Sequence, residues 1–192
     1  MANPSLVLTI LFISPLILAM ASSSCPCPYT CENEINLRFY LIQVDSGAGK
    51  NQFGIYSPKT GHFGQTAVND WILVESPAPD AKLVGRAQGV HIMSDVASVG
   101  WFASFNIVFQ GDRFNGSTLQ VMGVLSLEAE WAIVGGTGEL AMARGTIKKR
   151  EALPQPTPPP GSDIWQLDIH ASYPKNSAEC YGSVIVTSAE DK

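Results

Sequence analysis

Residues 82–90 read KLVGRAQGV and residues 101–109 read WFASFNIVF, and these two stretches decide the fold class. In both, apolar residues alternate with polar or small ones, which is the pattern of a β-strand with one buried face. Residues 37–44 (LRFYLIQV) repeat the pattern. Further candidate strands run at about 51–57, 62–70, 117–125, 130–134, 141–150, 163–173 and 180–187.

Turn residues separate these candidate strands. Breaks at 46–49 (SGAG), 77–80 (PAPD), 111–112 (GD) and 115–116 (NG) fall where hairpin turns are needed. Closing such a sheet on itself removes exposed, aggregation-prone edges. We therefore predict an all-β fold, an antiparallel β-barrel of about eight strands with an interior that side chains can fill.

Composition excludes several classes of protein. The 192 residues include 12 Lys+Arg against 17 Asp+Glu, a net charge of −5, which argues against a nucleic-acid-binding protein. Only 15% of residues are charged and 45% are hydrophobic, which argues against disorder and for a large buried core. Seventeen Gly and 13 Pro suit many short strands better than long helices.

The N-terminal residues 1–21 are predicted to be a signal peptide. They carry no charged side chain, and an apolar run at 6–18 (LVLTILFISPLIL) precedes Ala19-Met20-Ala21, a small-x-small pattern that predicts cleavage after Ala21. The run is shorter than the ~20 residues that a membrane-spanning helix needs. We expect a secreted, extracellular protein without membrane association.

Beyond the signal peptide we expect a Cys-rich segment at 22–36, a barrel domain at 37–187 and a polar tail at 188–192. The sequence 154–161 (PQPTPPPG) favours extended polyproline II and predicts a protruding loop within the barrel domain.

Four cysteines follow the predicted cleavage point, and an oxidising compartment favours disulfides. A bridge from Cys31 or a neighbour to Cys180 would tie the N-terminal segment to the end of the barrel, but four cysteines allow three connectivities. A metal site built from Cys25, Cys27 and Cys31 lacks a nearby fourth ligand, so we predict no metal.

Most signatures of catalysis or cofactor binding are missing. The glycine-rich 135–138 (GGTG) lacks the Lys-Ser/Thr of a phosphate-binding loop and is predicted to be a turn, so no cofactor is expected. The basic run 148–150 (KKR) is interpreted as a solvated strand end. Asn115-Gly116-Ser117 is a glycosylation sequon in a predicted turn, which makes Asn115 a candidate glycosylation site.

Several motifs occur in an order that closely resembles the plant dirigent proteins, over about residues 35–187. More narrowly, 69–71 (NDW), 101–102 (WF) and 117–123 (STLQVMG) look like the dirigent half of grass chimeras that carry a jacalin-type lectin domain, although we expect no lectin domain here. The motifs that carry the resemblance are 63–64 (FG), 68–70 (VND), 84–89 (VGRAQG), 105–109 (FNIVF), 115–119 (NGSTL) and 134–145 (VGGTGELAMARG).

The resemblance implies an antiparallel barrel, dimeric or trimeric, in the apoplast. Members of the family steer the coupling of two phenoxy radicals derived from monolignols such as coniferyl alcohol, so that one lignan stereoisomer results. A separate laccase or peroxidase makes the radicals, and the dirigent protein has no redox activity of its own. The implied partners are phenolic radical substrates, the external oxidase and further copies of the chain.

The resemblance also implies candidate site residues. The family places an acidic residue after the GGTG turn and an Arg shortly after it, here Glu139 and Arg144. A carboxylate can transfer the proton of a cyclising hydroxyl, and a guanidinium can hold a phenolate. A salt bridge between strands at the barrel rim is the alternative for this pair. Asp70 is a third candidate catalytic residue, and the candidate substrate-binding residues are Arg86, Phe105 and Phe39. For Arg86 the alternative of a buried structural ion pair is favoured.

One departure from the family keeps two other functions open. Gln43 replaces the acid that the family carries on its first strand, and an amide does not transfer protons. The loss favours a defence or carbohydrate-binding barrel without chemistry. A cyclase or dehydratase that acts on a preformed phenolic substrate is the other alternative, and it would need Glu139 or Asp70 as a working acid but no oxidase.

Overall fold

The computed structural model describes residues 31–98, 100–152 and 161–175, all within the compact unit Cys31–Lys192. The predicted signal peptide, Cys180, the candidate strand at 180–187 and most of the proline-rich stretch lie outside the described residues. In the described part of the chain, no helix is long and apolar enough to cross a bilayer. The elements are β1 (Glu32–Val44), β2 (Gln52–Tyr56), β3 (Thr66–Val74), β4 (Leu83–Met93), β5 (Trp101–Phe109), β6 (Thr118–Leu125), β7 (Ala129–Thr137), the short 3-10 helix η1 (Gly138–Leu140), β8 (Arg144–Glu151) and β9 (Ser162–Pro174).

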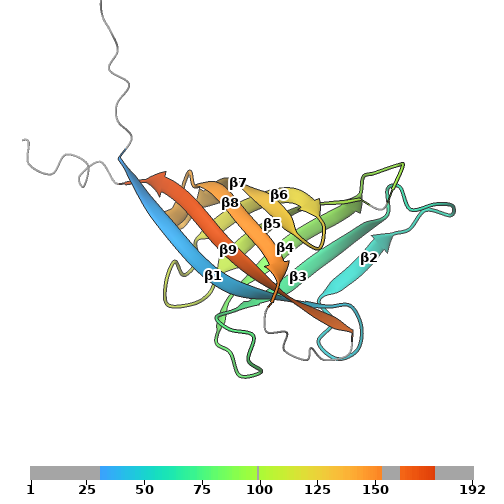
Figure 1. Ribbon diagram of the computed structural model, residues 1–192, viewed down its shortest axis with the longest axis horizontal. Helices are drawn as coiled ribbons and strands as arrows, with labels where there is room; N and C mark the ends of the chain where they lie inside the picture. Colours follow the sequence, from blue (N-terminus) through green and yellow to red (C-terminus); the bar gives the residue numbers. More distant parts are fainter. Residues whose placement is uncertain (1–30, 99, 153–160, 176–192) are drawn as a thin grey trace, which may run out of the picture. The chain divides into compact units, whose positions relative to one another are not determined.

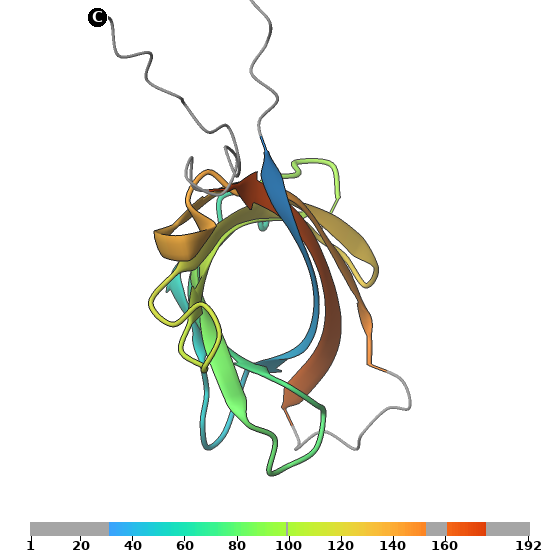
Figure 2. The same ribbon diagram turned by 90° about the vertical axis from the view of Figure 1, so that its left-hand side faces the viewer.

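The strands form a closed antiparallel barrel, which confirms the predicted fold. Sheet order is β1-β9-β8-β7-β6-β5-β4-β3, and β1 pairs back onto β3 with Tyr40 opposite Val74 and Ile42 opposite Ile72 (Figures 1 and 2). Eight strands therefore make the ring, while β2 pairs only with β3, with Gln52 opposite Asn69. Closure leaves β1, β8 and β9 with a hydrogen-bonded neighbour on each side.

The strand bounds broadly follow the alternation of the sequence, with several differences. The strand expected at 62–70 lies at Thr66–Val74, because residues 57–65 form a loop in which Gly61 and Gly64 have positive φ, and the strand expected from 141 begins at Arg144, after η1. β5 spans 101–109 as predicted, but β1 begins at Glu32 because Ile35 continues the inward-facing pattern and is only 3% exposed. The GGTG stretch is not a turn throughout: Gly135 and Gly136 belong to β7. A Cβ on Gly136 would lie 2.2 Å from the Leu140 carbonyl oxygen, so glycine here admits a close neighbour.

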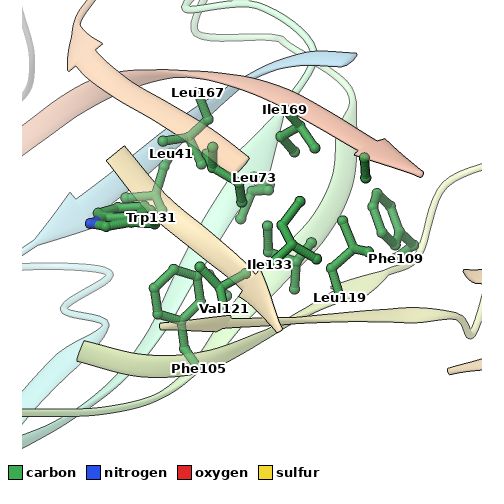
Figure 3. Close-up of a cluster of buried hydrophobic side chains, with 14 of the residues drawn as sticks. Leu41, Leu73, Phe105, Phe109, Leu119, Val121, Trp131, Ile133, Leu167 and Ile169 are labelled. Carbon is green, nitrogen blue, oxygen red and sulfur yellow. The ribbon is translucent and has the colours of Figure 1, made fainter. Parts of the chain in front are cut away.

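The barrel interior is filled by apolar side chains from all eight ring strands. In β5, Phe105, Ile107 and Phe109 are buried whereas Asn106 is exposed, as expected for a strand with one inward face. Burial of one such side chain contributes roughly 1.5–3 kcal/mol. Figure 3 shows inward-pointing side chains that include Leu41, Leu73, Phe105, Phe109, Leu119, Val121, Trp131, Ile133, Leu167 and Ile169.

The VGRAQG motif is explained by close contact between β4 and β5. A Cβ on Gly89 would lie 2.2 Å from the Ser104 carbonyl oxygen, and a Cβ on Gly85 would lie 2.6 Å from that of Val108. Both obstacles are backbone atoms, which no rotamer change can move away. Glycine at these two positions therefore sets how closely the two strands approach.

Candidate functional site

The two ends of the barrel carry different side chains. We call the end at which β1 starts and η1 lies the Glu139 end, and the end at which β1 finishes and β9 begins the Trp end. All four tryptophans of the chain, Trp71, Trp101, Trp131 and Trp165, face the interior toward the Trp end.

A pocket of about 600 Å³ lies at the Glu139 end, and we call it the Glu139 pocket. Its size falls in the range of about 300–1,000 Å³ that is common for small-molecule sites. The pocket combines a carboxylate, a phenol ring, a thioether and an ammonium group, and its lining residues are Asn33, Gly138, Glu139, Ala141, Met142, Tyr173, Pro174 and Lys175.

The backbone of Glu139 is fixed although its side chain is exposed. Gly138 has φ +65°, a value that glycine adopts without strain, and it turns the chain from β7 into η1. The backbone N–H of Glu139 donates a hydrogen bond to Ser117 Oγ at 3.0 Å, and Ser117 is buried. Leu140 is fully buried and anchors the same turn. The Cα of Glu139 is thus held at a defined position, from which the exposed carboxylate reaches the pocket.

Met142 is the second unusual residue of this pocket. It has φ +64°, a left-handed conformation that costs a non-glycine residue roughly 1–2 kcal/mol, and its side chain is 75% exposed. The next residue, Ala143, is only 2% exposed, and its packing holds the Met142 backbone in this strained conformation. Strained backbone of this kind is concentrated at functional sites.

Arg144 is not joined to Glu139. Its Nη2 lies 2.6 Å from a carboxylate oxygen of Glu32 at the start of β1, and the Arg144 side chain is 62% exposed. Among the described residues, no hydrogen bond or ion pair links Arg144 to Glu139. The alternative of a salt bridge between Glu139 and Arg144 is therefore wrong, because Arg144 pairs instead with Glu32 on the other side of β9.

An aromatic cluster lies behind the Glu139 pocket, inside the barrel. Tyr173 packs edge-on against Phe114 with ring centres 6.5 Å apart, and Phe114 packs against Phe109 at 5.7 Å. Phe109 in turn contacts Phe39 at 6.3 Å. The predicted substrate-binding Phe39 is thus connected through this cluster to Tyr173 of the pocket wall.

A second aromatic cluster fills the Trp end. His91 lies between Trp101 and Trp71 at 5.1 and 5.7 Å, and Phe105 lies between Trp71 and Trp131 at 5.7 and 5.3 Å. Burial lowers the pKa of His91, so its imidazole is kept neutral. The predicted substrate-binding Phe105 belongs to this cluster and is 3% exposed.

Lys149 corrects the interpretation of 148–150 as a solvated strand end. It is 5% exposed and points inward from β8, where its Nζ lies 3.2 Å from the centre of the Trp165 ring. The indole N–H of Trp165 donates to Gln43 Oε1 at 2.7 Å. Burial lowers the pKa of Lys149 to about 8. The inward position of Lys149 was not predicted because a lysine is hydrophilic and was therefore assigned to solvent. The two-residue period of the strand nevertheless places Lys149 on the same face as the buried Ile147.

Asp70 and Arg86 are brought together, but away from both clusters. They lie on the outward-facing positions of β3 and β4, and Arg86 Nε and Nη2 donate to the two Asp70 carboxylate oxygens at 2.6 and 2.7 Å. This hydrogen bonding is the main reason why the pKa of Asp70 is lowered and that of Arg86 raised. The alternative of an ion pair for Arg86 is confirmed, with both side chains partly exposed rather than buried.

Two further predicted sites are only partly covered by the structure. Asn115 is exposed in the turn between β5 and β6, a position open to a glycan, and its glycosylation stays a prediction. Cys31 lies at the start of the described chain and Cys180 outside it, so the predicted disulfide stays a prediction.

The chain is similar to known proteins over most of its described length. The family model of the Dirigent-like proteins matches residues 34–172. Dirigent protein 1 of Arabidopsis thaliana is 35% identical over 158 residues, which cover 76% of this chain and 87% of that protein. Pterocarpan synthase 1 of Glycine max is 37% identical over 128 residues, which cover 62% of this chain and 69% of that protein. A solved structure of the pterocarpan synthase dirigent protein GePTS1 aligns with a TM-score of 0.66 and 28% identity, covering 76% of this chain and 87% of that chain.

Proposed function

Because the chain belongs to the Dirigent-like protein family, we propose that it directs the stereochemistry of phenoxy radical coupling in phenylpropanoid biosynthesis. The substrates are two radicals derived from a monolignol such as coniferyl alcohol, and a separate laccase or peroxidase generates them. The protein supplies position and proton transfer, while the oxidase supplies the redox step.

The Glu139 pocket is the observation that carries this proposal. It places a fixed backbone turn with an exposed carboxylate beside the ring of Tyr173, in a space of about 600 Å³. An aromatic wall orients a planar phenol ring by offset or edge-to-face contact. Selectivity needs only a small free-energy difference, because about 1.4 kcal/mol between two competing transition states yields a tenfold excess of one product.

The chemistry balances without an electron from the protein. Each radical contributes its one unpaired electron to the new carbon–carbon bond, which leaves two quinone methides. A side-chain hydroxyl oxygen of each half then attacks the quinone-methide carbon of the other half. The hydroxyl proton goes to a base and a proton returns to the quinone oxygen, which restores the phenol. Glu139 can serve both transfers because a carboxylate accepts and then donates one proton.

The experiment that tests the proposal separates guidance from oxidation. The protein is incubated with coniferyl alcohol with and without laccase, and the products are resolved by chiral chromatography at equal conversion. We expect no turnover without laccase and an enantiomeric excess in one coupled product when both proteins are present. Racemic product equal to that of laccase alone would contradict the proposal for this substrate.

A ring-forming reaction on a preformed phenolic substrate is the second candidate function. The similarity to two proteins named pterocarpan synthase favours it. The same Glu139 carboxylate would act as the acid, and the reaction would proceed without an oxidase. Conversion of a closed-shell phenolic alcohol by the protein alone, abolished in Glu139→Gln, is the result that would favour this function over radical coupling.

We further propose that the active form is a secreted homo-oligomer. The outward faces of β6 and β7 expose Met122, Val124 and Val134, at 40%, 58% and 54%. Met122 and Val134 line a groove of about 300 Å³ that extends to β4. Association with a second copy would remove this apolar surface from water. Light scattering of the purified secreted protein tests the expectation, and a monomer at micromolar concentration would contradict it.

A further inference from the structure

A groove of about 560 Å³ crosses the outer face of β1, β9 and β8, on the barrel wall rather than at either end. We call it the β1–β9–β8 groove. Strand register arranges its polar side chains in two rows. One row is Arg38, Asp168 and Lys148, and the other is Asn36, His170 and Thr146.

The groove holds an excess of positive charge although the whole chain carries −5. Asp168 contributes the carboxylate of the lining, and it is ion-paired with both Arg38 and Arg150 at 2.6 Å. Burial by itself raises the pKa of Asp168, but hydrogen bonds from Arg38 and Gln166 outweigh it, so that the pKa is lowered and the carboxylate stays ionised. Two guanidinium groups therefore share one negative charge.

Lys148 adds a cation that has no partner in the described part of the chain. It is exposed, and no hydrogen bond or ion pair of its ammonium group is present there, not even with Glu130, its register neighbour on β7. Strands lie about 4.8 Å apart, so Arg38 and Lys148 flank β9 with a backbone separation of roughly 10 Å. Asp168 lies between them on β9, and its carboxylate is directed to Arg38 and Arg150. An incoming anionic group therefore has Lys148 as its closest cation and Arg38 as a second cation across β9.

The neutral side chains beside these cations indicate the rest of the ligand. Asn36, Thr146 and His170 offer amide, hydroxyl and imidazole groups, which suit a ligand rich in hydroxyl groups. An acidic peptide would fit less well, because peptides gain affinity by pairing with a free strand edge, and β8 and β9, which form the floor of this groove with β1, are paired on both sides. A nucleic acid would need a larger cationic surface.

We propose that the β1–β9–β8 groove binds a carboxylate-bearing polysaccharide, a chain of uronic acid sugars. A sugar carboxylate pairs with the Lys148 ammonium group, with Arg38 as the second cation of the groove, and the sugar hydroxyls bond to Asn36, Thr146 and His170. Such a site would hold the barrel on an acidic extracellular matrix while the Glu139 pocket stays open to phenolic substrates. The site is independent of the coupling function, because it shares no residue with the Glu139 pocket.

Titration calorimetry with a purified oligogalacturonate tests the proposal at low ionic strength. We expect saturable binding that weakens at least fivefold in Lys148→Gln, a variant that keeps the Arg38–Asp168 pair and hence the fold. The double variant Arg38→Gln/Lys148→Gln should abolish binding. The control Lys50→Gln/Lys59→Gln also removes two positive charges, but neither lysine lines the groove. This variant should bind like the original protein.

Three results would overturn the proposal. The first is the absence of binding, and the second is an equal loss of affinity in the groove and control variants, which would indicate a general charge effect. The third is equal affinity for a poly-glutamate peptide or for a neutral galactan of matched length. Enantiomeric excess in the laccase assay is measured on the same variants and should not change, so a failure of this site leaves the proposed function unaffected.

Discussion

The ammonium group of Lys149 lies 3.2 Å from the centre of the Trp165 ring, inside the Trp end of the barrel. Its Nζ also donates to the carbonyl oxygens of Ser126 and Leu127 at 2.6 and 3.3 Å. The indole face and the two carbonyl groups replace the water that surrounds an exposed lysine. They do so only in part, because burial lowers the pKa of Lys149 from 10.5 to about 8.

This shift predicts a stability gain at alkaline pH. Between pH 8 and 10.5 the unfolded chain keeps the Lys149 proton while the folded barrel loses it, so the free energy of unfolding rises with pH across this window. Each pKa unit corresponds to ~1.4 kcal/mol, which limits the gain to about 3 kcal/mol. Urea unfolding of the original protein and of Lys149→Met, at matched pH values from 7 to about 10.5, measures it.

The methionine variant controls for all other titrating groups, because both proteins share them. The unfolding free energy of the original protein should therefore increase relative to that of Lys149→Met as pH rises from 8 to 10.5. Parallel curves over the whole range would mean that Lys149 has an ordinary pKa and is solvated.

The VGRAQG motif predicts a glycine requirement in β4. Gly89→Ala places a Cβ 2.2 Å from the Ser104 carbonyl oxygen, and overpacking of this kind costs roughly 1–3 kcal/mol. Gly54→Ala on β2 is the matched control, because its Cβ meets no atom within 4 Å. Thermal unfolding should show a clear loss for Gly89→Ala and a change within ~0.5 kcal/mol for Gly54→Ala. Equal melting temperatures for the two variants would contradict the proposed close approach of β4 and β5.

Met142 provides a test of where a phenolic substrate binds. A ligand in the Glu139 pocket covers this methionine, so oxidation by dilute peroxide to the sulfoxide should slow down in its presence. N-acetylmethionine added to the same solution is the control, because its oxidation should not depend on the pocket. The phenol methyl ether of coniferyl alcohol is a suitable ligand because it forms no phenoxy radical, and mass spectrometry reads both methionines. Equal slowing of both oxidations, or of neither, places binding elsewhere.

Much of the fold is predictable from the sequence because the strands follow the hydrophobic alternation closely. Phe105, Ile107 and Phe109 mark the inward face of β5 without ambiguity, and the turn signals between the strands match the observed loops. The end of β7 was not predictable in this way. Gly135 reads as a turn residue, and only its packing against the Gln120 side chain shows why a strand continues there.

The site is less predictable because its chemistry depends on which ends of distant strands meet. Glu139 and Arg144 are close in sequence, yet Arg144 pairs with Glu32 of β1, which lies on the other side of β9 and is 112 residues away in the sequence. Lys149 is hydrophilic and was assigned to solvent, although the strand period places it inside. Hydropathy can be read from a single sequence, but the polar residues that a barrel encloses cannot be identified from hydropathy.

The most direct test of the central claim is the enantiomeric excess of laccase-coupled coniferyl alcohol, measured with the original protein, with Glu139→Gln and with Glu130→Gln. Glu130 is an exposed carboxylate on β7 outside the pocket lining, so it controls for the loss of a negative charge. We expect a clear excess with the original protein and with Glu130→Gln, and near-racemic product with Glu139→Gln. An unchanged excess in Glu139→Gln would contradict the assignment of the chemistry to the Glu139 pocket, and racemic product with all three proteins would contradict the coupling function itself.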